Sequence, residues 1–140
     1  MQHKRGFTQI EVLVVLAVIT TIAATALPAM TSLGAALRLA ASVRTLTETL
    51  RETRARALAE GEALDALFDP TTGTWRVQTA AGTRRRLEML PAPLRFTALP
   101  ASNRIRFGAT GTAENGTIVV GSGALSRRIV VNQRGRVRLG

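Results

Sequence analysis

The first thirty residues contain the longest apolar stretch of the chain. From 7 to 30 nearly all side chains are hydrophobic or small, and Glu11 is the only charged one. About 20 such residues are enough for a helix to cross a bilayer. The pattern therefore predicts a membrane-spanning helix over 7–30. Lys4 and Arg5, which come directly before it, predict a cytoplasmic N-terminus because positive charges stay on that side.

A helical pattern continues from 31 to 60. Apolar residues recur there at steps of three and four, so one face is mostly apolar, and Arg54 also falls on this face. Gly61 is a typical helix stop. Pro28 lacks a backbone donor, which predicts a kink or a locally melted turn. We therefore expect one long helix whose amphipathic second half, over 31–60, packs against a domain.

The hydrophobic period changes to two from residue 62 onward. Glycine, proline and asparagine clusters separate eight candidate strands, at 63–68, 74–79, 84–90, 94–98, 104–108, 117–121, 127–132 and 136–139. A β domain over 62–140 is too small to bury a large core alone, so the helix should complete it. The expected fold class is α+β, with a long N-terminal helix, its first half transmembrane, packed against a small antiparallel sheet or sandwich.

The composition excludes several kinds of site. Among 140 residues, 46% are hydrophobic, which is too many for a disordered chain. The chain has no cysteine, which excludes disulfides and thiolate chemistry, and its one histidine is His3. No nucleophile and base can be paired from such a set. We expect no catalytic residue, no metal and no cofactor, and hence no enzyme.

Glu11 is the residue that decides between interpretations of the N-terminus. A charge inside a spanning helix costs about 2.5–3.5 kcal/mol on insertion scales, so it should have a partner or a function. A secretory signal peptide cut after Ala26 is one alternative, because 24–26 reads Ala-Thr-Ala. A plain membrane anchor is another. Glu11 and the unbroken helical pattern beyond Ala26 argue against the signal peptide.

The segment from Gly6 to Ile19, which reads GFTQIEVLVVLAVI, resembles the class III signal of type IV pilins and type II secretion pseudopilins. The resemblance implies that a prepilin peptidase removes the leader 1–6 by cutting after Gly6, and then methylates Phe7. Glu11 matches the family's glutamate and Pro28 matches its helix-kinking proline. Gln9 is the one position that does not match the residue most common in the family. Glu11 of one subunit would then pair with the Phe7 amine of a neighbour and set the register of the assembly.

The C-terminal half is similar to the GspH/FimT family. The matching stretches are Ile105-Arg106-Phe107, Gly111, Gly116-Thr117-Ile118, 128–132 and 135–138. This resemblance implies a structural subunit, either a minor pseudopilin of a type II secretion pseudopilus or a minor pilin of a type IV pilus. Its expected partners are other pilin subunits, the prepilin peptidase and the inner-membrane assembly platform. The expected location is the inner membrane, with one membrane pass and a periplasmic C-terminal domain, and then the filament.

Charge is concentrated in the same half. Residues 70–140 hold twelve arginines and two glutamates, so the net charge of +10 resides there. Gly135-Arg136-Val137-Arg138 also resembles a Gly-Arg-x-Arg motif that is implicated in DNA uptake in FimT members. The candidate residues for phosphate contacts to double-stranded DNA, without sequence specificity, are Arg134, Arg136, Arg138, Arg127 and Arg128. A solvent-exposed sheet face, an arginine-rich composition and an acidic protein partner are the alternatives.

Overall fold

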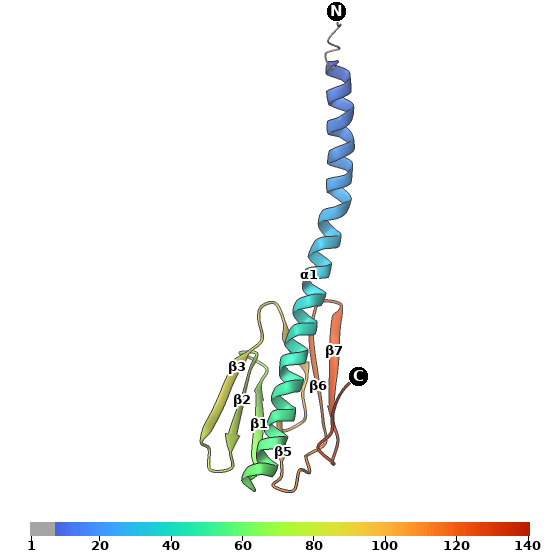
Figure 1. The fold of residues 1–140 in the computed structure, drawn as a ribbon. Helices are drawn as coiled ribbons and strands as arrows, with labels where there is room; N and C mark the ends of the chain where they lie inside the picture. The colour runs from blue at the N-terminus through green and yellow to red at the C-terminus, as the bar shows by residue number, and fades with distance from the viewer. Residues whose placement is uncertain (1–7) are drawn as a thin grey trace, which may run out of the picture. The chain divides into compact units, whose positions relative to one another are not determined.

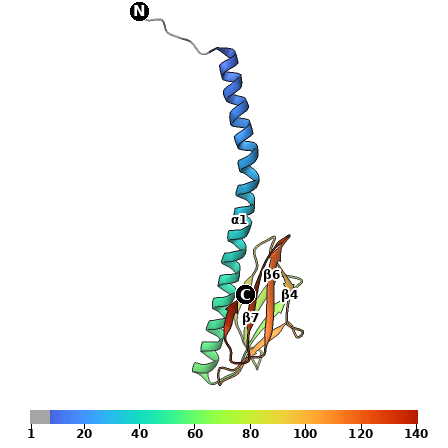
Figure 2. The ribbon, with the colours of Figure 1, turned by 90° about the vertical axis from the view of Figure 1, so that its right-hand side faces the viewer.

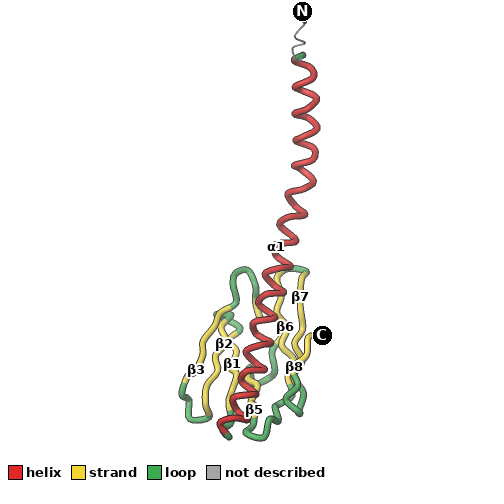
Figure 3. Tube along the Cα trace, viewed as in Figure 1, coloured by secondary structure: helices red, strands yellow, loops and turns green. Residues whose placement is uncertain are grey.

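The structure, a computed structural model, describes residues 8–140, without the side chains of 25–29, 31, 84 and 85. Over this range it contains one helix and eight strands (Figure 3). The helix α1 comprises Gln9–Glu60. Thr8 caps its start, because the Thr8 hydroxyl accepts a hydrogen bond from the Glu11 amide at 3.3 Å. Gly61, with φ +65°, ends it in the left-handed conformation that glycine favours.

The chain divides into two compact units, residues 1–35 and residues 36–140. In the first unit α1 continues through Pro28 without interruption, so the local melting expected there is not observed and the kink stays a prediction. Across the described part of the chain, no helical stretch has both the length and the apolarity that a membrane crossing needs. The span expected over 7–30 is therefore not confirmed by the structure.

The second unit contains two antiparallel sheets of four strands each. Sheet A has the order β3-β2-β1-β5 and consists of β1 Leu64–Asp69, β2 Thr74–Thr79, β3 Arg84–Met89 and β5 Arg104–Phe107. Sheet B has the order β4-β6-β7-β8 and consists of β4 Arg95–Ala98, β6 Gly116–Ser122, β7 Leu125–Val131 and β8 Val137–Leu139. In Figure 1 the two sheets lie behind the last turns of α1, one on either side.

One hydrophobic core joins the helix to both sheets. The helix contributes a stripe at steps of three, four and seven residues: Leu39, Val43, Leu46, Leu50 and Ala57. Sheet A adds Phe107 and Ile105, which are fully buried, and sheet B adds Ile118 and Ile129. In Figure 2 sheet B lies along one side of the last turns of α1, with β7 nearer to the helix than β4. Burial of the stripe explains why the amphipathic second half of the helix belongs to the folded domain.

The α+β fold class expected from the sequence, a long N-terminal helix packed against a small antiparallel β domain, is confirmed. All eight strands occur, and their observed ends differ from the expected ones by at most two residues. The sequence pattern did not indicate the two-sheet pairing, in which β5 returns to lie beside β1 while β4 joins the other sheet. Arg54, expected on the apolar face of the helix, is half-buried and donates a hydrogen bond instead.

Candidate functional site

The N-terminal candidate site lies only partly within the described structure. Gly6 and Phe7, the expected cleavage and methylation positions, lie outside the described residues. Glu11 is exposed in the first turn of α1, where a negative charge is favoured by the helix dipole. Within residues 8–140 its carboxylate has no ion-pair partner. The arrangement leaves this carboxylate available to a cation from elsewhere.

The C-terminal candidate site is the turn that joins β7 to β8. The side-chain oxygen of Asn132 accepts hydrogen bonds from two backbone amides, that of Arg134 at 3.1 Å and that of Arg136 at 2.9 Å. The Gly135 amide donates to the Asn132 carbonyl at 2.8 Å. Asn132 therefore fixes the backbone of the turn from which the arginines project. This role of Asn132 was not predicted from the sequence, although asparagine is a typical turn-forming residue.

Position 135 needs a glycine because neighbouring atoms leave no room for a side chain there. Its φ is +69°, and a Cβ built there would lie 2.3 Å from the Gly111 carbonyl oxygen and 2.5 Å from Nε of Arg54. The same Arg54 Nε donates to the Gly111 carbonyl at 3.0 Å. Arg51 donates to the Val137 carbonyl at 3.3 Å. Arg51 thus ties the start of β8 to α1, whereas Arg54 ties the loop at Gly111 to α1 and lies close to Gly135.

The structure brings three of the candidate arginines together. Arg134, Arg136 and Arg138 line an open hollow of about 440 Å³, along with Asn115, Asn132 and Gln133. Val137 between them is buried, so Arg136 and Arg138 project from the opposite face of the chain. None of the described residues that line this hollow is acidic. The spacing of two residues therefore gives a shared basic surface, with Arg134 contributing from the turn rather than from the strand.

The other two candidate arginines lie on opposite sides of β7. Val130 pairs with Arg138, and side chains alternate along a strand, so Arg128 shares the outer face with Arg138. Arg127 lies on the same face of β7 as Ile129. The Ile129 side chain is buried in the core, whereas the Arg127 side chain is exposed. Of these two arginines, Arg128 is the one that shares the outer face of sheet B with Arg138.

Arg104 and Arg106, both on β5 of sheet A, have acidic partners. Arg106 forms two hydrogen bonds with the buried Asp65, at 2.7 and 3.0 Å, and the contact raises the pKa of the Arg106 guanidinium. Arg104 reaches Glu114 at 3.1 Å. Within the described residues no such ion pair involves Arg134, Arg136 or Arg138. The unpaired guanidinium groups make the β7–β8 turn the more suitable of the two regions for an anionic ligand.

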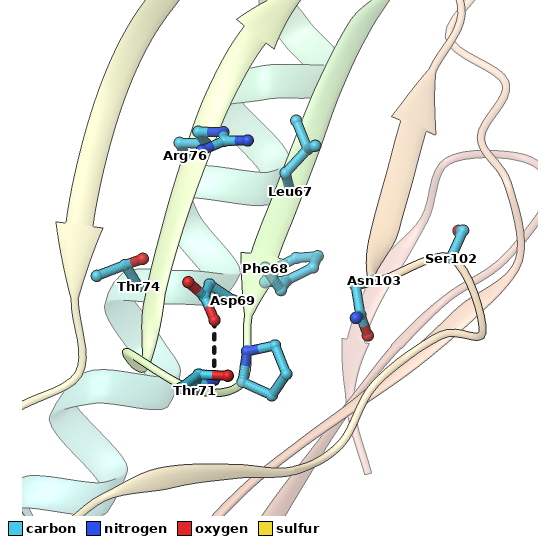
Figure 4. Close-up of a pocket in the computed structure, with 9 residues that line it drawn as sticks. Leu67, Phe68, Asp69, Thr71, Thr74, Arg76, Ser102 and Asn103 are labelled. Atoms are coloured by element: carbon cyan, nitrogen blue, oxygen red, sulfur yellow. Dashed lines mark hydrogen bonds between the residues drawn. The ribbon is translucent and has the colours of Figure 1, made fainter.

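A second hollow, also of about 440 Å³, lies at the end of β1 and the start of β2 (Figure 4). Its walls include Arg76, Ser102 and Asn103. The Asp69 carboxylate accepts hydrogen bonds from the Thr71 amide at 2.8 Å and the Thr72 amide at 3.3 Å. Hydrogen bonds from Thr72 and from the Thr71 backbone lower the pKa of Asp69. Asp69 is therefore a turn-forming residue, as its position before Pro70 indicates.

Two further observations limit the chemistry of the domain. Among the described residues no three acidic or histidine side chains gather closely enough to hold a metal ion. Trp75 is buried, with its ring edge-to-face to Phe96 at 6.4 Å between centroids, so it belongs to the core.

Two family models match the chain. The model described as type II transport protein GspH covers residues 42–135, and the prokaryotic N-terminal methylation motif covers residues 1–27. The GspH match covers more than half of the chain. The methylation motif implies membrane-anchored pilus assembly. No curated protein matches this chain.

The fold is similar to solved structures of minor subunits from two machines. The minor pseudopilin EpsH of the Vibrio cholerae type II secretion system aligns with a TM-score of 0.61 at 14% identity, over 73% of this chain and 95% of that one. The Pseudomonas aeruginosa type IV minor pilin FimU aligns with a TM-score of 0.61 at 19% identity, over 73% and 87%. From the family match and this fold, the chain belongs to the GspH family of structural subunits and is a minor pseudopilin or pilin of a type II secretion system or type IV pilus.

Proposed function

We propose that the chain is made as a precursor whose leader, 1–6, is removed after Gly6, and that Phe7 is then methylated on its new amine. Before assembly the segment 7–30 anchors the protein in the inner membrane with the leader in the cytoplasm and residues 36–140 in the periplasm. The methylation motif over residues 1–27 is the observation that supports this proposal. The protein then enters a pseudopilus or pilus as a non-catalytic subunit.

Glu11 selects and aligns the neighbouring subunit in this proposal. A carboxylate among apolar side chains is costly unless a cation neutralises it. The α-amine created at Phe7 supplies that cation when it belongs to the adjacent subunit. Glu11 has no ion-pair partner within residues 8–140, which is consistent with an intermolecular role. A neighbour placed one turn out of register would leave both charges unpaired.

Mass spectrometry of protein recovered from cell envelopes tests the processing step. A mature N-terminus at N-methyl-Phe7 supports the proposal, whereas an intact Met1 or a start at Leu27 contradicts it. The variant Glu11→Ala tests the charge pair separately. We expect it to reach the membrane normally and to be lost from purified filaments, with Gln9→Ala as the control. Normal incorporation of Glu11→Ala would refute the pairing.

DNA binding at the β7–β8 turn is the second candidate function. The supporting observation is the hollow lined by Arg134, Arg136 and Arg138, which contains no acidic residue. Arginine forks suit phosphate oxygens, and the absence of exposed aromatic rings beside them favours contacts without base stacking. Binding of this kind falls steeply as salt rises, because each phosphate contact releases a counterion. A type IV pilus subunit with this property would serve DNA uptake.

A gel-shift titration of the full chain in detergent tests this candidate. We expect the double variant Arg136→Ala/Arg138→Ala to weaken binding to double-stranded DNA and to reduce the salt dependence. Arg76→Ala is a matched control, because Arg76 is exposed on sheet A. No shift for the unmodified chain at low salt, or equal losses in the control, would exclude a specific role for the turn.

A further inference from the structure

The outer face of sheet A, opposite the core, carries an arginine in the middle of β2. Trp75 and Val77 flank Arg76 and are both buried, so Arg76 projects from the outer face. The register places Arg76 opposite Leu67 of β1 and opposite Leu87 of β3. Figure 4 shows Arg76 beside Leu67 on the adjacent strand. Arg76 is thus an exposed cation between two leucines.

The charged side chains of β1 and β5 on this face already have partners. Two ion pairs lie there, Arg106 with Asp65 and Arg104 with Glu114. The Asp69 carboxylate accepts hydrogen bonds from amides of the turn that follows it, and Figure 4 shows it directed away from Arg76. Among the side chains that the structure describes, no ion pair involves Arg76. The face therefore leaves the Arg76 guanidinium without a counter-charge.

Apolar side chains and a hollow surround Arg76. Leu87 is 53% exposed, and Met89, two residues further along β3, is 66% exposed. Leu67 is half-buried and, together with Arg76, lines the hollow of about 440 Å³ at the end of β1. Arginine and methionine are enriched at the centres of protein interfaces, where surrounding contacts exclude water. Leu67, Arg76, Leu87 and Met89, which we call the Arg76 patch, have this arrangement.

We propose that the Arg76 patch docks a different protein of the same assembly, which places a carboxylate on Arg76 and apolar side chains on the leucines. A guanidinium binds a carboxylate through two parallel hydrogen bonds. Apolar neighbours exclude water from such a pair, which strengthens it. A polyanion such as DNA would satisfy the charge but leave Leu87 and Met89 uncovered. This docking rests on the role of the chain as an assembled subunit.

A second copy of this chain is a poor source of the carboxylate. Most acidic residues of the unit 36–140 are already engaged. Five of them bind arginines of their own chain: Glu48, Glu52, Asp65, Glu88 and Glu114. Moving one of these carboxylates onto Arg76 of another copy would break an existing pair and leave its arginine without a partner. A different protein with a free carboxylate avoids this loss.

Photo-crosslinking of the full chain, in the cells that produce it, tests the proposal. With p-benzoylphenylalanine in place of Met89, irradiation should give one main adduct. Mass spectrometry should place the link beside an aspartate or glutamate of another subunit. Arg76→Ala should lower the adduct yield by at least about ten-fold, as expected for a central interface arginine. Arg95→Ala, which removes an exposed arginine from β4 of sheet B, is the matched control and should leave the yield unchanged.

A charge exchange provides the second measurement. Arg76→Glu should keep the circular dichroism spectrum and abolish the adduct, and arginine in place of the linked acidic residue of the other protein should restore it. No adduct, a link to a second copy, loss of the adduct after nuclease treatment, or an unchanged yield in Arg76→Glu would overturn the proposal. The adduct is scored independently of the mature N-terminus, so an unprocessed unmodified chain would refute the proposed processing and not the docking.

Discussion

Sheet A and sheet B each have four strands and share one core, but their charges are arranged in opposite ways. The strands of sheet A contain Asp65, Asp69 and Glu88, and two of these carboxylates bind arginines of the same sheet. The strands of sheet B contain no acidic residue, although they carry four arginines: Arg95, Arg127, Arg128 and Arg138. Two carboxylates of sheet A are therefore bound by arginines of their own sheet, whereas the arginines of sheet B have no acidic residue within the strands of that sheet.

The largest expected loss of stability comes from substituting a glycine in the turns that connect the strands of sheet B. Gly135→Ala should destabilise the domain by about 3 kcal/mol, because the left-handed backbone and the contact with the Gly111 carbonyl both oppose a Cβ. Gly123→Ala is the control, since its φ is +58° but nothing lies within 4 Å. It should cost only about 1 kcal/mol. Chemical denaturation measures both, and equal losses would contradict the packing role of Gly135.

The next effect is expected in sheet A. Asp65→Asn should cost about 2 kcal/mol, because it weakens a two-point contact, although solvent around the Arg106 side chain, 42% exposed, reduces the loss. Glu114→Gln weakens a more exposed pair and should cost less than about 0.5 kcal/mol. Unfolding curves of the two variants give the comparison. If Glu114→Gln lost more unfolding free energy than Asp65→Asn, the burial of an ion pair would not determine how much it contributes to stability.

A smaller loss of stability is expected where the helix holds the loop that contains Gly111, next to Gly135 of the β7–β8 turn. Arg54→Ala removes one charged hydrogen bond to the Gly111 carbonyl and should cost about 1.5 kcal/mol. Its position next to Gly135 means that Arg54→Ala and Gly135→Ala should not be additive. A double-variant cycle measures this coupling. Strict additivity would indicate that the two residues act independently.

The smallest expected effect is on the pH dependence of stability, through Asp69 at the end of β1 in sheet A. The folded-state pKa of Asp69 lies below the ordinary value of 3.8, so its contribution to stability is present above that pH and is lost as the pH falls through the folded-state value. Asp69→Asn should therefore destabilise the domain at neutral pH and make little difference in strong acid. Denaturation at both pH values checks this. A constant difference between the two proteins would show that the carboxylate charge is not involved.

Local features of the fold were predictable because single residues mark them. Gly61 ends the helix, and Gly73 and Gly135, both with positive φ, lie in turns at the expected strand ends. Pairings between distant segments were not predictable, since the contact of Asp65 with Arg106 depends on the register of β1 and β5. Glu11 stood out as a charge in an apolar run. The clustering of Arg134 with Arg136 and Arg138 followed from spacing, but their support by Asn132 and Arg54 required the folded chain.

The two amides held by Asn132 have a thermodynamic consequence for the arginine turn. Conformational freedom of the backbone at Arg134 and Arg136 is already lost when the domain folds. An anion that settles into the hollow therefore needs to immobilise only the guanidinium side chains, at about 0.5–1.5 kcal/mol each. A flexible loop with the same arginines would bind the anion more weakly, because binding would also have to remove the conformational entropy of the backbone.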